Sequence, residues 1–209
     1  MLWAWESPQD LRFLDTPRVG VAYLAATLFL SGEEVRLVHR HQPVRTRAKT
    51  PLMAVFRIES DPRKTPSGKR AAELIRGEFA VAHLSAIQVD FDARRSERPF
   101  YQTLLTDLRA KFGPSTFISV TALASWCEKG SWIESVPIDE AVPMVFRMGP
   151  DRAAVFTRLS SGGDFGSRVC RTSTGISMDE PVPQLKHARR LYIFHPGSWD
   201  AVSVASYLR

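Results

Sequence analysis

Cysteine is scarce in this chain, and its scarcity excludes several kinds of site. Only Cys127 and Cys170 occur among 209 residues, which is too few for a disulfide framework. They do not form the CxxC spacing that zinc and redox sites use, and we therefore expect two free thiols. The HExxH spacing of zinc hydrolases is also absent. No metal site and no cofactor are predicted.

Long apolar runs and leader segments are missing as well. The longest run, about residues 19–30, contains Gly20 and Tyr23 and is too short to span a bilayer. The opening MLWAWES lacks a basic leader and a long apolar core, so neither a membrane span nor a signal peptide is expected. A cytoplasmic location is the default expectation, and the cell envelope stays open if the natural start lies upstream. The phosphate loops GxGxxG and GKS/T are absent, which argues against nucleotide cofactors.

What remains is the composition of an ordinary soluble domain. The chain is 44% hydrophobic and 24% charged, which is enough for one well-filled core, and we predict a single domain over residues 1–209 that is monomeric. The formal charge of +6 comes mostly from scattered arginines. Because no basic run alternates with aromatic residues, nucleic acid is not an expected partner.

Eight strand-like runs follow one another, separated by helix or loop signals. They predict an α/β fold, a small irregular (β/α)8 TIM-like barrel, because strands that alternate with helices form a parallel sheet. A hairpin excursion around Ser31-Gly32 is expected after the second strand. The predicted strands are residues 2–5, 19–26, 52–59, 84–93, 117–126, 141–148, 168–177 and 190–194. The predicted helices are residues 7–14, 69–79, 98–111 and 151–159, with a closing helix to Leu208.

The fourth predicted strand, LSAIQVDFDA, is the most informative stretch. A strand's period of two puts Ile87, Val89 and Phe91 on one face. Gln88, Asp90 and Asp92 share the other face. Carboxylates at the carboxyl end of a parallel strand point into the pocket of a barrel. Asp92, nearer the pocket mouth, is therefore the predicted acid or base, with Asp90 supporting it.

Further candidates follow the ends of other predicted strands. Glu180 is the predicted partner of Asp92 in acid and base chemistry, and three tryptophans are predicted to form a sugar platform. Each candidate also has a structural interpretation: Arg57 with Asp90 as a buried ion pair, Asp179 and Glu180 as a helix cap, His195 as a hydrogen-bonded loop residue, and the tryptophans as packing. The predicted substrate-binding residues are Arg57, Glu59, Trp5, Trp126, Asp179, His195 and Trp199.

Six motifs carry a resemblance to a known family. In order they are LWAWESPQDLRFLD, VFRIES, IQVDFDA, ISVTALASWC, PMVFRMG and GISMDEP. Together they resemble a bacterial family classed only as domain of unknown function 3142, over nearly all of the chain. The family implies no established activity. Its strand-end carboxylates resemble those of chitinase-like barrels with a DxxDxDxE strand, but here Arg94 stands where the catalytic Glu would be.

These observations favour a glycoside hydrolase-like barrel that acts on a bacterial saccharide or another small polar ligand. Such enzymes use two carboxyl groups, about 5 to 5.5 Å apart for retention and roughly 6.5 to 9.5 Å for inversion. Two alternatives stay open. The first is a non-catalytic carbohydrate-binding barrel, which Arg94 favours. The second is a metal-dependent hydrolase that uses Asp90, Asp92 and His195 as ligands.

Overall fold

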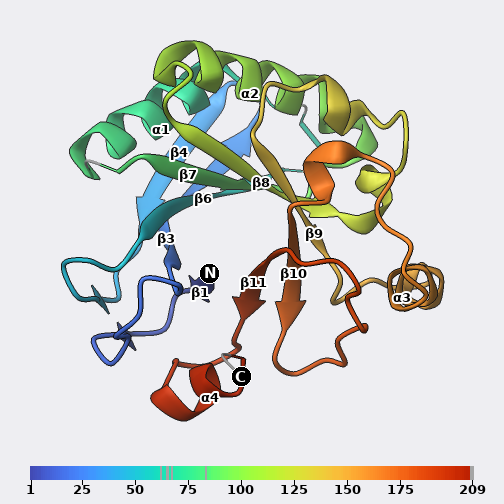
Figure 1. Ribbon diagram of the computed structural model, residues 1–209. Helices are drawn as coiled ribbons and strands as arrows, with labels where there is room; N and C mark the ends of the chain where they lie inside the picture. The colour runs from blue at the N-terminus through green and yellow to red at the C-terminus, as the bar shows by residue number, and fades with distance from the viewer. Residues whose placement is uncertain (62, 65, 67, 83, 208–209) are drawn as a thin grey trace.

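A closed barrel of eight parallel strands forms the centre of the molecule (Figure 1). The structure is a computed structural model that describes residues 1–61, 63–64, 66, 68–82 and 84–207. The strands of the barrel are β1 (Leu2–Ala4), β3 (Val21–Ser31), β6 (Leu52–Ser60), β7 (Ala86–Asp90), β8 (Phe117–Leu123), β9 (Glu140–Met144), β10 (Ser173–Ser177) and β11 (Arg190–Phe194). Barrel strands that are consecutive in the chain are neighbours, and β1 pairs in parallel with both β3 and β11, which closes the barrel. The predicted TIM-like barrel is therefore confirmed.

Two long helices cover one side of the barrel, as Figure 1 shows for α1 (Lys69–Ala82) and α2 (Arg98–Phe112). Both were expected from the spacing of their apolar residues. In α2, Pro99 stands in the first turn and Gly113 ends the helix with φ 74°. The face toward the sheet is fully buried and consists of Tyr101, Leu104, Leu105 and Leu108. Two shorter helices follow later, α3 (Arg152–Ser160) and α4 (Ala201–Ala205).

The first βα unit lacks its predicted helix, so the prediction for residues 7–14 is wrong. The segment contains the short strand β2 (Gln9–Asp10), which pairs in parallel with β5 (Val44–Arg45). Gln9 is 2% exposed, and its side chain donates to Ser7 Oγ and accepts from the Trp199 backbone N–H. These long-range bonds hold an extended backbone where the Ser-Pro signal alone favours a helix. The predicted end of the closing helix, Leu208, lies outside the described residues.

The strand after β1 is longer than predicted. β3 runs without interruption from Val21 to Ser31, and β4 (Glu34–His39) pairs with its second half in antiparallel register, from Ala26 opposite His39 to Ser31 opposite Glu34. Gly32 has φ 60° at the turn, a conformation that glycine adopts without strain.

Several predicted strands are shorter than expected, and in two of them the missing residues form 3-10 turns. These turns are η2 (Ala124–Cys127) after β8 and η4 (Arg168–Cys170) before β10. Two more, η1 (Arg95–Glu97) and η3 (Trp132–Ser135), lie in the connections that follow β7 and β8. Single turns of this kind make compact connections, and here they take the place of helices in a short chain.

The expectation of free thiols is wrong, because Cys127 and Cys170 form a disulfide. Their Cα atoms lie 5.8 Å apart, and the bond joins η2 to η4 across 43 positions of sequence. Two cysteines without a CxxC spacing gave no sequence signal for this bond, since only the fold brings the two turns together. The disulfide ties the connection after β8 to the strand two places further around the barrel.

Removing this disulfide is expected to lower the free energy of unfolding. A double variant, Cys127→Ala with Cys170→Ala, should lose about 2–4 kcal/mol, because the reduced chain regains conformational freedom in the unfolded state. Urea denaturation of the oxidised protein and the double variant measures the difference. Equal unfolding midpoints and slopes would show that the bond is not formed in solution.

Two separate cores flank the strands. The larger core lies between the outer face of the barrel and its helices. The smaller core fills the inside of the barrel with Trp3, Ala22, Met53, Val55, Val142 and Tyr192. Gly175 is required there, because a Cβ at this position would lie 2.9 Å from the Trp3 ring. The small residue on β10 therefore makes room for the large one on β1.

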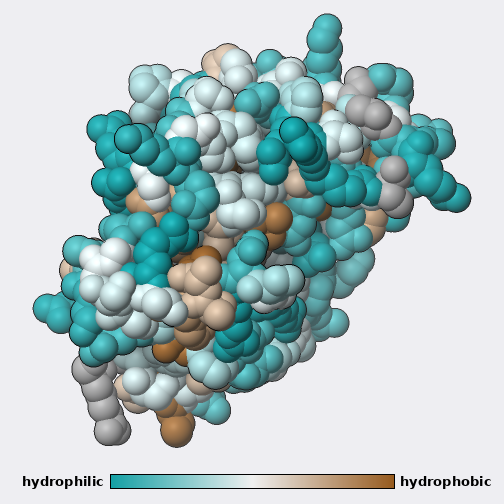
Figure 2. Space-filling model, turned by 90° about the vertical axis from the view of Figure 1, so that its right-hand side faces the viewer, coloured by the Kyte–Doolittle hydropathy of each residue, from teal (hydrophilic) through white to brown (hydrophobic). Residues whose placement is uncertain are grey.

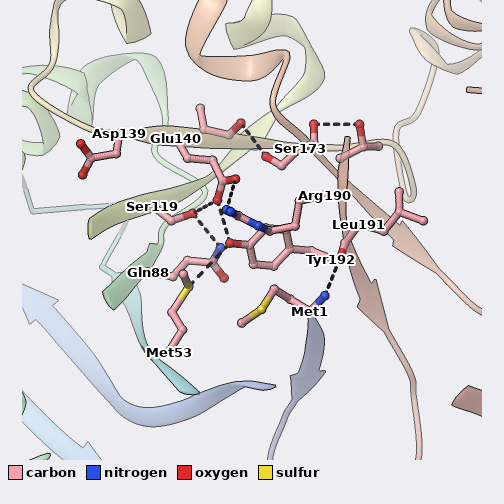
Figure 3. A network of polar contacts seen from close by, with 12 residues as sticks. Met1, Met53, Gln88, Ser119, Asp139, Glu140, Ser173, Arg190, Leu191 and Tyr192 are labelled. Atoms are coloured by element: carbon pink, nitrogen blue, oxygen red, sulfur yellow. Dashed lines mark hydrogen bonds and ion pairs between the residues drawn. The ribbon is translucent and has the colours of Figure 1, made fainter. Parts of the chain in front are cut away.

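A chain of buried polar groups crosses the barrel interior, as Figure 3 shows. Gln88 donates to Ser119 Oγ at 3.0 Å, and Ser119 donates to the Glu140 carboxylate at 2.9 Å. Tyr192 donates to the same carboxylate at 2.7 Å, and Arg190 donates at 2.8 Å. Glu140 is 1% exposed, so these bonds replace the water that its charge would otherwise need.

Candidate functional site

An open pocket of about 450 Å³ lies at the carboxyl ends of the strands, where parallel barrels hold their sites. Its walls combine aromatic rings with charged groups of both signs. The aromatic residues are Trp3, Trp5, Phe146 and Phe194. The charged residues are Asp90, Asp92, Asp151, Arg57 and Arg147. The side of the molecule that carries α3 is mostly hydrophilic, with a band of hydrophobic surface across it (Figure 2).

Two predicted carboxylates, Asp90 and Asp92, lie together in this pocket. β7 ends at Asp90, whose side chain accepts a hydrogen bond of 2.7 Å from Thr121 Oγ1 on β8. Asp92 follows two residues later and is more exposed. The strand end therefore delivers Asp90 to the pocket, and Asp92 reaches the same pocket just beyond the strand, so both acids lie together as the sequence predicts.

Partial desolvation inside the pocket raises the pKa of both carboxyl groups. For Asp90, desolvation is the main cause, the Thr121 hydrogen bond acts in the opposite direction, and the neighbouring Asp92 charge raises the pKa further. For Asp92, desolvation raises the pKa while the Arg57 guanidinium lowers it. A carboxyl group with a raised pKa stays protonated to higher pH and is suited to donate a proton.

Arg57 lies beside Asp90 in the parallel register of β6 and β7 but forms its ion pair elsewhere. Its Nε donates to Glu59 at 3.0 Å, and its guanidinium lies 5.7 Å from the centre of the Trp5 ring. The structural interpretation of Arg57 and Asp90 as an ion pair is therefore wrong. Glu59 lines a separate hollow beside β4 and does not line the pocket.

The aromatic wall differs from the predicted sugar platform. Trp5, which follows the end of β1, lines the pocket as expected, together with Trp3 on that strand. Phe146 and Phe194 stack with ring centres 6.0 Å apart and planes 6° apart. Sequence reasoning missed Trp3 and both phenylalanines, although the two-residue spacing of the tryptophans indicated that they share one face.

The other two predicted platform tryptophans are buried outside the pocket. Trp126 is 2% exposed and packs against Trp132, with ring centres 5.0 Å apart. Trp199 is 4% exposed and donates its indole N–H to the Trp3 carbonyl. Both serve packing, because the 3-10 turn at Trp126 and the loop at Trp199 point these rings into the core.

Glu180 does not line the pocket but supports one of its walls. Its carboxylate oxygens accept from the Arg147 backbone N–H at 3.1 and 3.2 Å, and one of them also accepts from Arg152 at 3.1 Å. These bonds hold the loop that follows β9. That loop brings Arg147 and Asp151 to the pocket, and neither was among the predicted residues.

Two further predicted residues bond locally. Asp179 accepts from the Ser177 hydroxyl, which lowers the pKa of Asp179. His195 Nδ1 accepts from the Gly197 backbone N–H at 2.8 Å, as in its interpretation as a loop residue. Neither lines the pocket.

Arg94 stands where a chitinase-like strand has its catalytic Glu, and it is engaged outside the pocket. Its Nε donates to Glu97 at 2.9 Å, and its Nη2 donates to Ser60 at 3.0 Å. Within the described residues, no group of three or more His, Cys, Asp or Glu side chains is placed to hold a metal ion. No helix in the described part of the chain is long and apolar enough to cross a membrane.

The fold and the pocket define a parallel (β/α)8-type barrel with an acidic and aromatic site at its carboxyl end. Comparison with known proteins adds no relative. No family model, curated protein or solved structure matches the chain. The resemblance to domain of unknown function 3142 stays a prediction.

Proposed function

We propose that this barrel binds a saccharide in its pocket and hydrolyses a glycosidic bond, with Asp92 as the proton donor. One observation carries the proposal: two carboxyl groups with raised pKa, Asp90 and Asp92, share an open pocket with a wall of aromatic rings. Aromatic faces bind the apolar faces of sugar rings, and a protonated carboxyl group can donate to the leaving oxygen.

The second carboxylate of the mechanism is best assigned to Asp90. Asp92 lies two residues beyond the end of β7 at Asp90, so the two Cα atoms are at most about 7 Å apart, which is compatible with the carboxyl separations of glycoside hydrolases. Glu180, the partner expected from the sequence, has both carboxylate oxygens occupied by Arg147 N–H and Arg152. Two carboxyl groups in one pocket allow one of them to carry the negative charge that stabilises the oxocarbenium-like transition state while the other donates the proton. The Thr121 hydrogen bond favours the charged form of Asp90.

A panel of oligosaccharides tests the proposal. Neutral, amino-, acidic and sulfated oligosaccharides are incubated with the protein, binding is measured by calorimetry, and new reducing ends are measured by a colorimetric assay. Binding together with release of reducing ends supports hydrolysis. Binding without cleavage favours the non-catalytic carbohydrate-binding barrel, the alternative supported by Arg94. If no oligosaccharide of the panel is bound or cleaved, both the hydrolase and the carbohydrate-binding barrel are contradicted.

Arg57→Gln is expected to shift the pH profile of hydrolysis. The Arg57 charge lowers the pKa of Asp92, so its removal should raise that pKa further. Because Asp92 acts in its protonated form, activity is lost as pH rises through its pKa, and this alkaline limb should move to higher pH in the variant.

The pH dependence of kcat/KM measures this shift. Arg12→Gln is the matched control, because Arg12 also pairs with a carboxylate two residues away but lines no part of the pocket. If the alkaline limb of Arg57→Gln lies at the same pH as that of the unmodified protein, Asp92 is not the proton donor.

A further inference from the structure

Arg147 places an uncommitted positive charge in the pocket. Its guanidinium carbon lies 5.2 Å from the centre of the Phe194 ring, and both residues line the pocket. Within the described residues, this guanidinium forms no ion pair and donates no hydrogen bond. Besides the Ser177 hydrogen bond, the Arg147 charge lowers the pKa of Asp179. The Asp179 carboxylate accepts its hydrogen bond from the Ser177 hydroxyl, however, and not from the Arg147 guanidinium. The N–H groups of Arg147 therefore remain available to a ligand.

The backbone of Arg147 is held in a strained conformation. Its φ of 51° is the only positive value at a non-glycine position among the described residues, and such a conformation costs free energy in an L residue. Both Glu180 carboxylate oxygens accept from its N–H, and Arg152 fixes the same carboxylate. Strain maintained by a dedicated contact is typical of functional positions. Glu180 is thus a positioning residue for Arg147.

The pocket carries charges of both signs. Asp90 ends β7 and Asp92 follows it, with Arg57 of β6 beside them, whereas Arg147 and Asp151 lie on the loop after β9. An anionic substituent is attracted to the Arg147 guanidinium, which forms no ion pair with a carboxylate among the described residues. The guanidinium lies against the Phe194 ring, and a guanidinium can bind a carboxylate or sulfate through two parallel hydrogen bonds.

We propose that Arg147 binds an anionic substituent of the substrate, so that the pocket selects acidic saccharides. The inference rests on the proposed saccharide function and adds the substrate class to it. The shared chemistry is a planar or tetrahedral oxyanion on a sugar ring, either the carboxylate of a uronic acid or a sulfate ester. Which of the two binds better is decided by the experiment.

The test compares matched ligands by calorimetry. The probes are trigalacturonic acid, its fully methyl-esterified form, which is uncharged, and a trisaccharide of neutral sugars that carries a sulfate ester. The unmodified protein should bind at least one anionic probe about tenfold or more tightly than the neutral ester. Arg147→Gln should abolish this preference, while affinity for the neutral ester should change little. Arg147→Lys should retain part of it, because the charge remains but the two-pronged geometry is lost.

Two further variants separate a binding role from a structural one. Arg36→Gln is the matched control, since Arg36 also lies over a phenylalanine ring, at 4.4 Å from the centre of Phe29, but does not line the pocket. It should keep the preference. Arg147→Gly should lose the preference without a fall in Tm, because glycine adopts a positive φ freely. Glu180→Gln should weaken binding of the anionic probe more than binding of the ester.

The outcomes distinguish this inference from the function on which it rests. Equal affinity for charged and neutral probes, or an undiminished preference in Arg147→Gln, overturns the inference and leaves saccharide binding intact. An anionic preference that depends on Arg147 but comes without cleavage supports the inference and contradicts hydrolysis. If the protein binds none of the three probes, the inference is overturned. If it also binds no saccharide of the wider panel, the inference and the proposed saccharide function are both overturned.

Discussion

Asp92→Asn is expected to lower kcat for saccharide hydrolysis by about 100- to 10,000-fold, the range that a general acid contributes. Asparagine has nearly the same shape as aspartic acid but cannot donate a carboxyl proton. Because Asp92 is exposed in the pocket, the substitution should leave both Tm and the affinity for substrate nearly unchanged. Single-turnover release of reducing ends, measured beside the unmodified protein, quantifies the loss.

Asp107→Asn is the control for this variant. Asp107 lies on α2 and does not line the pocket, so the same chemical change there should leave kcat unaltered. Undiminished turnover in Asp92→Asn would end the assignment of Asp92 as the acid. A large loss in both variants would instead indicate a general effect on the preparation.

Glu140→Ala is expected to have the largest effect on stability. The substitution leaves the Tyr192 hydroxyl and the Arg190 guanidinium without their shared carboxylate partner. Breaking a buried ion pair from one side typically costs about 3–5 kcal/mol, because the remaining charge stays desolvated. Arg190 is partly exposed and can recover some hydration, which places the expected cost at the lower end of that range. For a chain of this length this corresponds to a fall in Tm of about 10 °C.

Calorimetry or circular dichroism during heating measures this change. Glu134→Ala serves as the control, because Glu134 is exposed and forms no ion pair among the described residues. Its Tm should stay within about 2 °C of the unmodified value, as for most surface substitutions. A similarly small change in Glu140→Ala would show that the polar chain of Figure 3 contributes little to stability.

The pocket joins a rigid side to an adjustable one. Asp90 and Trp3 lie on strands β7 and β1, and Asp92 and Trp5 follow within two residues of the strand ends, so the barrel sets their positions. Arg147 and Asp151 come from the loop after β9, which Glu180 holds through side-chain bonds. In barrels of this kind, strand ends commonly supply catalytic groups and loops supply specificity. The proposed roles of Asp92 and Arg147 follow this division.

Much of the fold follows from local patterns. The strand-like pattern of β6 and the helical spacing of apolar residues in α2 each predict one kind of element. Eight predicted strands in order, separated by helices or loops, then favour a parallel barrel. The placement of Asp90 in the pocket follows from the same period of two, because a strand in a closed barrel has an inner and an outer face, and Asp92 reaches the pocket just beyond the strand end. These features were predicted from the sequence.

Contacts between residues distant in the chain decided the rest. Gln9 forms its bonds with a loop about 190 positions away, which removed a predicted helix. Cys127 and Cys170 meet only because two 3-10 turns lie side by side in the fold.

The same holds for the site. Trp126 faces the core and Trp3 faces the pocket, although their local sequences gave no such distinction.

The sequence by itself determined the barrel and the pair of acids at its mouth, because secondary-structure periods are local properties. Only the tertiary structure decided that Glu180 supports a wall and that Arg147 faces the ligand space. Partners across the barrel are set by packing and register, and neither is encoded in the spacing of nearby residues.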